Sequence, residues 1–158
     1  MDKETAIKAL KESIKTRALL YWEFYRVFSE ELGEEKAAEL MKKAIYNRGT
    51  DKAGCAGVTP GDFSGLAENF RKGGEKSLEV FGHEVAEAAE DYALLRLNSC
   101  PLVEAWKEAG LTDGQIASMC DIAYAVDFGK FEGMGFHLKF QRRISDDEPS
   151  CDLHITKP

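Results

Sequence analysis

The chain has 158 residues, of which 44% are hydrophobic, and a formal net charge of -7. This length supports one ordinary core, so we expect a single domain over residues 1–158, with a helical N-terminal part (1–75) and an α+β part (76–158). The net negative charge argues against a nucleic-acid partner. The sequence has no run of about 20 apolar residues, so no membrane partner is expected. Together with the charged N-terminus, these features predict a cytoplasmic protein.

The N-terminal part is predicted to be helical. Apolar residues recur every three or four positions from Lys3 to about Glu30, which indicates a long amphipathic helix. Its aromatic cluster, Tyr21 to Tyr25, covers more than one side of this helix. Core packing is the favoured interpretation, and a homo-oligomer contact through this helix is the alternative. A second helix is expected over residues 34–48, because an acidic start and a basic end suit the helix dipole.

Glycines then suggest breaks in regular structure. Residues 49–61 contain four glycines and a proline, which is typical of a loop, and the spacing fits no phosphate-binding motif. A short helix over residues 62–72 is expected to end at Gly73-Gly74. Strands are predicted over residues 77–85 and 90–98.

The C-terminal half should place helices before a hairpin. A helix is expected over residues 103–109, and Thr112 and Gln115 have capping-box spacing at the start of another that reaches Asp127. Alternating apolar residues over 136–144 and 151–156 predict a β-hairpin. The fold class is therefore α+β: N-terminal helices packed on an antiparallel sheet of about four strands, with two helices before the C-terminal β-hairpin.

Cys100 lies where a predicted strand turns into a helix. Free amides and the helix dipole at such a position favour a thiolate, which is the nucleophilic and metal-binding form. A small buried residue at a strand end is the equally weighted alternative. Strand periodicity puts Arg96 and Asn98 on the side of Cys100, where Arg96 would bind a substrate carboxylate and Asn98 would donate or accept hydrogen bonds. The slightly favoured alternative pairs Arg96 with an acid such as Glu84 on the solvent face.

Two further cysteines are candidates for the same site. Cys120 shares a helix stripe with Tyr124 and Asp127, which would form one wall of a pocket, although a core cysteine is the commoner outcome. Cys151 and His154 face opposite sides of a strand and cannot form a metal half-site together. Cys100, Cys120 and Cys151 could still hold zinc, iron or an iron–sulfur cluster, because disulfides are improbable in a reducing compartment.

The C-terminal half resembles the L-2-amino-thiazoline-4-carboxylic acid hydrolase-like family. The similarity runs from about Tyr92 to Ile155, with a looser match over residues 37–57. Its motifs are Cys100-Pro101-Leu102, Trp106, Gly110, Cys120, the glycines over 129–135 and Cys151. Members often have Gly-Asp before the last cysteine, where this chain has Pro149-Ser150.

The resemblance implies a small-molecule substrate and hydrolytic opening of a cyclic amidine at a carbon–nitrogen bond. On that basis Cys100 would be the nucleophile, Asp127 or a histidine the proton carrier, and Arg96 the carboxylate clamp, with Asn98 and Tyr124 beside the substrate. The alternative is a non-hydrolytic protein that binds a metal, a cluster or a sulfur-containing ligand through its cysteines. A third interpretation is that the cysteines only pack.

Overall fold

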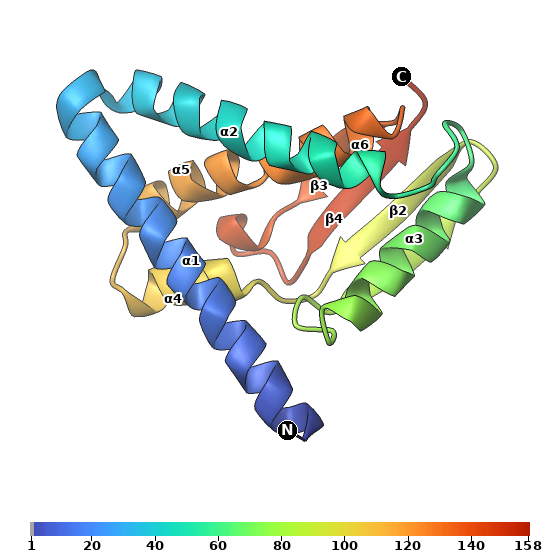
Figure 1. Cartoon of the computed structure of the whole chain (residues 1–158), viewed down its shortest axis with the longest axis horizontal. Coiled ribbons are helices and arrows are strands. Elements are labelled where there is room, and N and C mark those ends of the chain that lie inside the picture. The colour runs from blue at the N-terminus through green and yellow to red at the C-terminus, as the bar shows by residue number, and fades with distance from the viewer. Residues whose placement is uncertain (1) are drawn as a thin grey trace.

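The computed structural model describes residues 2–158, in which helices precede and interrupt a sheet (Figure 1). The elements are α1 (Lys3–Leu32), α2 (Glu34–Gly54), α3 (Phe63–Lys76), β1 (His83–Ala88), β2 (Tyr92–Leu97), α4 (Pro101–Glu108), α5 (Asp113–Ala123), α6 (Ala125–Gly133), β3 (His137–Arg142), the 3₁₀ helix η1 (Ile144–Asp146) and β4 (Cys151–Thr156). The predicted α+β class is confirmed.

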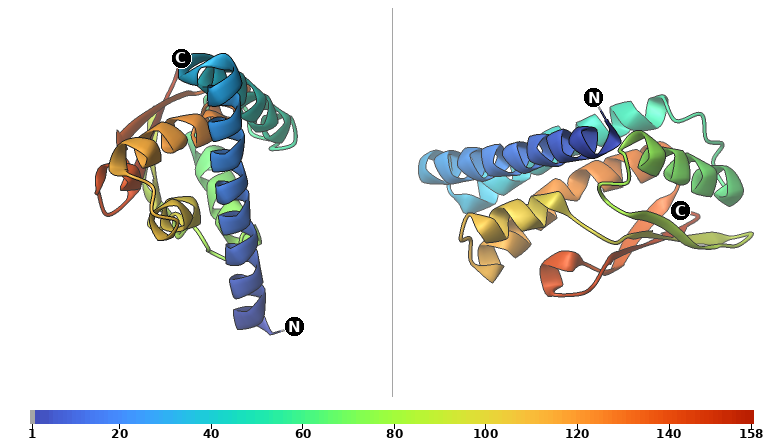
Figure 2. Two further views of the ribbon diagram at one scale, coloured as in Figure 1. Left: turned by 90° about the vertical axis from the view of Figure 1, so that its left-hand side faces the viewer. Right: turned by 90° about the horizontal axis from the view of Figure 1, so that it is seen from below.

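The four strands form an antiparallel sheet in the order β1-β2-β4-β3. Helices lie on one side of this sheet (Figure 2), and the side chains that face them are apolar and buried. Ala93 and Leu95 of β2 point to the helices, as do Leu153 and Ile155 of β4. The core therefore lies between the inner face of the sheet and the helical layer.

Helices α2 and α6 approach each other closely because glycines form their contact. A Cβ atom at Gly129 would lie 2.1 Å from the carbonyl oxygen of Tyr46. A Cβ atom at Gly49 would likewise lie 2.1 Å from the carbonyl oxygen of Val126. No side chain fits at these distances, so the two glycines allow the backbones to pack directly.

This contact explains one wrong prediction. Gly49 was expected to begin a loop, yet α2 continues to Gly54, because Gly49 is buried against α6. Helix α3 likewise continues through Gly73-Gly74, since Gly74 packs beside His83. In both helices, tertiary packing outweighs the low helix propensity of glycine.

Other differences concern where elements begin and end. The predicted first strand is shorter, because Leu78 and Glu79 adopt left-handed conformations with φ of 50° and 57°. The helix predicted from Thr112 to Asp127 divides at Tyr124 into α5 and α6, so three helices rather than two precede the hairpin. The capping box of Thr112 and Gln115 is confirmed.

Helix α1 has a packed side and an exposed side. Tyr21, Trp22 and Tyr25 pack against the core, while Leu20 and Phe24 are 50% and 45% exposed. The expected core packing is present, and the homo-oligomer contact remains a prediction. No helix among residues 2–158 is long and apolar enough to cross a membrane.

Candidate functional site

A cavity of about 310 Å³ lies between the helical layer and the inner face of the sheet. It is enclosed by α1, α2, the segment from α3 to β1, the turn from β2 to α4, helices α5 and α6, and the start of β4. Its polar lining consists of Arg17, Lys52, Ser77, His83, Ser99, Cys100, Cys120, Tyr124, Asp127, Lys130 and Cys151. Apolar lining includes Leu97, Leu102 and Trp106.

The topology brings together residues that are far apart in sequence. Cys100 is the N-cap residue of α4, just after β2. Leu97, the last residue of β2, pairs with Cys151, the first residue of β4. Cys120 and Tyr124 enter from α5 and its C-cap. The three cysteines predicted to share a site therefore line one cavity together with Tyr124 and Asp127.

The thiol of Cys100 is not acidified by its helix terminus. The backbone amides of Val103 and Leu102 lower its pKa, but burial is the larger effect and raises the pKa to about 12. Cys100 is partly accessible, in keeping with its place on the cavity wall. The expected thiolate is thus corrected: desolvation outweighs the helix N-terminus, and the side chain is a thiol at neutral pH.

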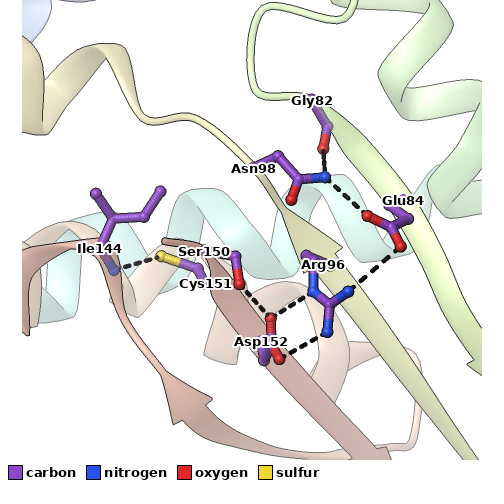
Figure 3. Close-up of polar contacts among 8 residues, drawn as sticks. All are labelled: Gly82, Glu84, Arg96, Asn98, Ile144, Ser150, Cys151 and Asp152. Atoms are coloured by element: carbon purple, nitrogen blue, oxygen red, sulfur yellow. Dashed lines mark hydrogen bonds and ion pairs between the residues drawn. The ribbon is translucent and has the colours of Figure 1, made fainter. Parts of the chain in front are cut away.

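The other two thiols are held in a buried network. The Tyr124 hydroxyl lies 3.3 Å from Cys151 Sγ. The Ile144 amide donates to the same sulfur at 3.3 Å, a contact shown in Figure 3. Burial raises the pKa of Cys120 to about 11, and it also raises the pKa values of Cys151 and Tyr124. These groups are therefore neutral at physiological pH.

The predicted metal site finds no support in the structure. Within residues 2–158 there is no group of three or more His, Cys, Asp or Glu side chains placed to hold a metal ion. Cys100, Cys120 and Cys151 line a common cavity, but they do not form such a group.

Asp127 is the acidic side chain of this cavity. Burial raises its pKa to about 6, while Lys130 and Lys52 lower it by smaller amounts. In the part of the chain that the structure describes, its carboxyl group makes no ion pair within 4 Å. Such a carboxyl group exchanges a proton readily near neutral pH.

A histidine of β1, His83, also lines the cavity. Burial lowers the pKa of His83, and its ring packs against Phe70 with centroids 4.7 Å apart and an interplanar angle of 54°. Its Nδ1 atom is buried and has no hydrogen-bond partner among the described residues. A neutral imidazole of this kind is available to a ligand.

Arg96 and Asn98 do not line the cavity. Figure 3 shows the partners that they contact instead. Arg96 donates to both carboxylate oxygens of Asp152, from Nε at 2.8 Å and Nη2 at 3.0 Å, and it contacts Glu84 at 3.3 Å. Asn98 donates to Glu84 at 2.9 Å and to the carbonyl of Gly82 at 3.2 Å. Both side chains are occupied by partners within the protein.

The predicted row of Arg96, Asn98 and Cys100 is therefore corrected. Strand β2 ends at Leu97, which lines the cavity, so Arg96 faces the other side of the sheet. Cys100 lies beyond the strand, where alternation no longer determines direction. The alternative pairing of Arg96 with an acidic neighbour is the observed one.

Sequence reasoning missed the basic residues of the cavity. Lys130 lies three residues after Asp127 on α6, and Lys52 comes from the end of α2 that was expected to be a loop. The spacing from Asp127 to Lys130 was a usable signal, because residues three apart share a helix face. Lys52 could not be placed without the contact between α2 and α6.

Comparison with solved structures finds the same fold in a subunit of a trafficking protein particle complex. The trafficking protein particle complex subunit 3 from Naegleria fowleri, covalently bound to palmitic acid, has a TM-score of 0.61 and 13% sequence identity. The match covers 94% of this chain and 96% of that subunit, and at this identity it shows the fold alone.

The family comparison covers nearly the whole sequence. A search among curated proteins finds no match. In contrast, the model of the L-2-amino-thiazoline-4-carboxylic acid hydrolase family matches residues 11–155, which include every element that lines the cavity. The chain therefore belongs to the L-2-amino-thiazoline-4-carboxylic acid hydrolase family.

Proposed function

We propose that this protein is a small-molecule hydrolase that opens a cyclic amidine ring at a carbon–nitrogen bond. The substrate suggested by the family name is L-2-amino-thiazoline-4-carboxylate. The observation that carries the proposal is the placement of Asp127, a carboxyl group without an ion-pair partner and with a pKa of about 6, in the same cavity as Cys100.

The cavity suits a small anionic ring in both charge and lining. Lys52 and Lys130 supply positive charge for the substrate carboxylate, a role for which Arg96 is not placed. Leu97, Leu102 and Trp106 provide apolar surface for the ring, and Tyr124 lies on the same wall as Cys120. A mostly apolar pocket with a few polar groups is typical of small-molecule sites.

Cys100 is the proposed nucleophile. Its pKa of about 12 is high for a thiol, so a base must accept its proton as it attacks. Water, with a pKa of about 15.7, would require roughly 5 kcal/mol more for the same proton transfer. The thiol is therefore the easier nucleophile, and Asp127 is the proposed base.

The proposed reaction has two steps. Cys100 Sγ bonds to the amidine carbon, its proton passes to Asp127, and the ring carbon–nitrogen bond breaks as Asp127 protonates the departing nitrogen. Water then adds to the same carbon, the bond to Sγ breaks, and the thiol regains a proton. The net change is the addition of one water molecule, which leaves a primary amine and a carbamoyl group on the substrate sulfur.

The test is ring opening by the purified protein after treatment with a chelator. The appearance of the primary amine is followed by NMR, and the covalent intermediate is sought by intact mass. We expect turnover by the wild type and a loss of at least about 100-fold in Cys100→Ala and Asp127→Asn. Cys55→Ala, which lies outside the cavity lining, should retain the rate. An unchanged rate in Cys100→Ala would contradict the nucleophile assignment.

A second candidate function is the binding of an acyl chain. It is favoured by the fold shared with a subunit covalently bound to palmitic acid, and by the apolar residues beside Cys100. The charged lining of Lys52, Asp127 and Lys130 favours the hydrolase instead. Intact mass after incubation with an acyl thioester distinguishes the two, because only this candidate predicts an acyl adduct that Cys100→Ala removes.

A further inference from the structure

A second hollow, which shares Tyr124 with the lining of the proposed active-site cavity, follows the free edge of the sheet. Strand β3 has β4 on one side and no strand on the other in the described part of the chain. A groove of about 980 Å³ runs along it, between the strand and helices α2 and α6. Every residue from His137 to Arg143 lines this groove.

The edge of β3 offers backbone groups at strand spacing. An edge strand exposes a row of unpaired N–H and C=O groups, which is a template for another extended chain. Peptides that bind in this way add a strand to the sheet, and their alternate side chains enter flanking pockets. The groove therefore has the geometry of a site for an extended peptide.

The groove is basic although the protein is acidic overall. Besides Arg143, four cations line it: Lys42, Lys43, Lys139 and Arg142. None of them forms an ion pair with another described residue. On a chain of net charge -7, these four cations concentrate positive potential along one strand.

The acidic residues of the groove already have partners. Arg143 pairs with Asp121 at 2.6 Å and with Asp146 at 3.0 Å, and Glu132 accepts a hydrogen bond from the Tyr46 hydroxyl at 2.6 Å. With five cations against three carboxylates, the groove lining keeps two positive charges in excess.

The groove also has an apolar wall that can receive side chains. The ring of Phe140 packs on Tyr124 and Phe128, with centroid distances of 4.4 Å and 5.8 Å. Phe128 and Phe140 are only partly buried, so they present apolar surface beside the strand.

We propose that this groove binds an acidic peptide segment of a partner protein, which adds to β3 as a fifth strand. Its alternate apolar residues pack on Phe128 and Phe140, and its acidic residues lie near the four cations. A second copy of this chain is disfavoured, because pairing β3 with β3 would bring Lys139 and Arg142 of both copies together. A nucleic acid is disfavoured, because it cannot use the hydrogen-bonding row of the strand edge.

The test measures the binding of short labelled peptides to the full-length protein by fluorescence anisotropy. A peptide that alternates Glu and Val should bind at low ionic strength and weaken with salt. A peptide that alternates Glu and Pro has the same charge, but every second residue lacks a backbone N–H group. This peptide should bind at least about tenfold more weakly. Equal binding of the two peptides would overturn the proposal.

Charge-reversal variants test the location. The double variant Lys139→Glu/Arg142→Glu should weaken binding of the Glu–Val peptide by more than about tenfold. Lys3→Glu/Lys8→Glu makes the same charge change on exposed residues of α1 and should have less than about a twofold effect. Similar losses in both double variants would overturn the proposal, as would tighter binding of single-stranded oligothymidine than of the peptide, or dimerisation that the groove variant abolishes.

Discussion

Two aspartates on opposite sides of the sheet show how the same side chain acquires different roles. Asp152 is only 4% exposed, and it accepts hydrogen bonds from Arg96 and from the Ser150 hydroxyl at 2.7 Å. Hydrogen bonding to Arg96 is the main reason that the pKa of Asp152 is lowered. Asp127 lies in the cavity without an ion-pair partner among the described residues, and burial raises its pKa to about 6.

The difference shows that partners, more than residue type, determine whether the pKa of an aspartate is raised or lowered. The charges of Asp152 and Arg96 satisfy each other, so this pair contributes to stability. The cations near Asp127 compensate only part of the cost of its burial, and its proton is therefore available for transfer near neutral pH.

The largest expected effect comes from disturbing the helix that holds Asp127. Gly129→Ala should lower the free energy of unfolding by about 3 kcal/mol or more, because the new Cβ would overlap the Tyr46 carbonyl. Gly114→Ala is the matched control in α5, since a Cβ there meets no atom within 4 Å. Urea denaturation measures both, and equal stabilities would show that the contact between α2 and α6 is not tight.

Removal of the Asp152 carboxylate, which is paired with Arg96, should lower stability and leave activity unchanged. Asp152→Asn is expected to lower the free energy of unfolding by about 1–3 kcal/mol, because it weakens the bidentate pair with Arg96. Asp51→Asn, which affects an exposed pair with Arg48 at 3.8 Å, should cost less than about 0.5 kcal/mol.

The pH dependence of the Asp152 contribution has a definite sign. Because its pKa is lowered in the folded state, the contribution is present above the ordinary value of 3.8 and is lost as pH falls below it. Loss of activity in Asp152→Asn without loss of stability would reverse the roles assigned to the two aspartates.

Removal of the cavity carboxyl should have the opposite effect on stability. The folded state binds the Asp127 proton more tightly than the unfolded state, so wild-type stability should fall as pH rises from about 3.8 to about 6. Asp127→Asn should therefore raise the free energy of unfolding at pH 7 by up to about 3 kcal/mol. Thermal unfolding measured across this pH range checks the trend, and a destabilised variant would contradict it.

The smallest effect concerns thiol reactivity, which should change without any change in stability. Cys55 is exposed, whereas burial raises the pKa values of Cys100, Cys120 and Cys151. Brief treatment with iodoacetamide should therefore modify one thiol in the wild type and none in Cys55→Ala, as read by intact mass. Fast modification of Cys100 would indicate a thiolate and contradict the burial effect.

The sequence predicts local features of this fold well. The long first helix, the Thr112–Gln115 capping box and the inward side of β4 follow from periodicity and capping chemistry. The continuation of α2 through Gly49 does not follow from these local features. It depends on a backbone contact with α6, a helix that lies far from Gly49 in the sequence.

Residue pattern predicts which side chains lie near one another better than it predicts their pKa values. Cys120, Tyr124 and Asp127, expected on one helix stripe, line the same cavity although the helix divides at Tyr124. Arg96 was an attractive clamp, but strand geometry directs it to Asp152. The pKa of Cys100 could not be predicted from its N-cap position, since desolvation depends on the whole surrounding core.

The pH dependence of ring opening tests the role of Asp127 most directly. If Asp127 is the base, kcat/KM for L-2-amino-thiazoline-4-carboxylate should rise with an apparent pKa near 6 and level off above it. Asp127→Asn should lose both the rate and this inflection. A wild-type profile that is flat through pH 6, or an inflection that persists in Asp127→Asn, would contradict the proposed mechanism.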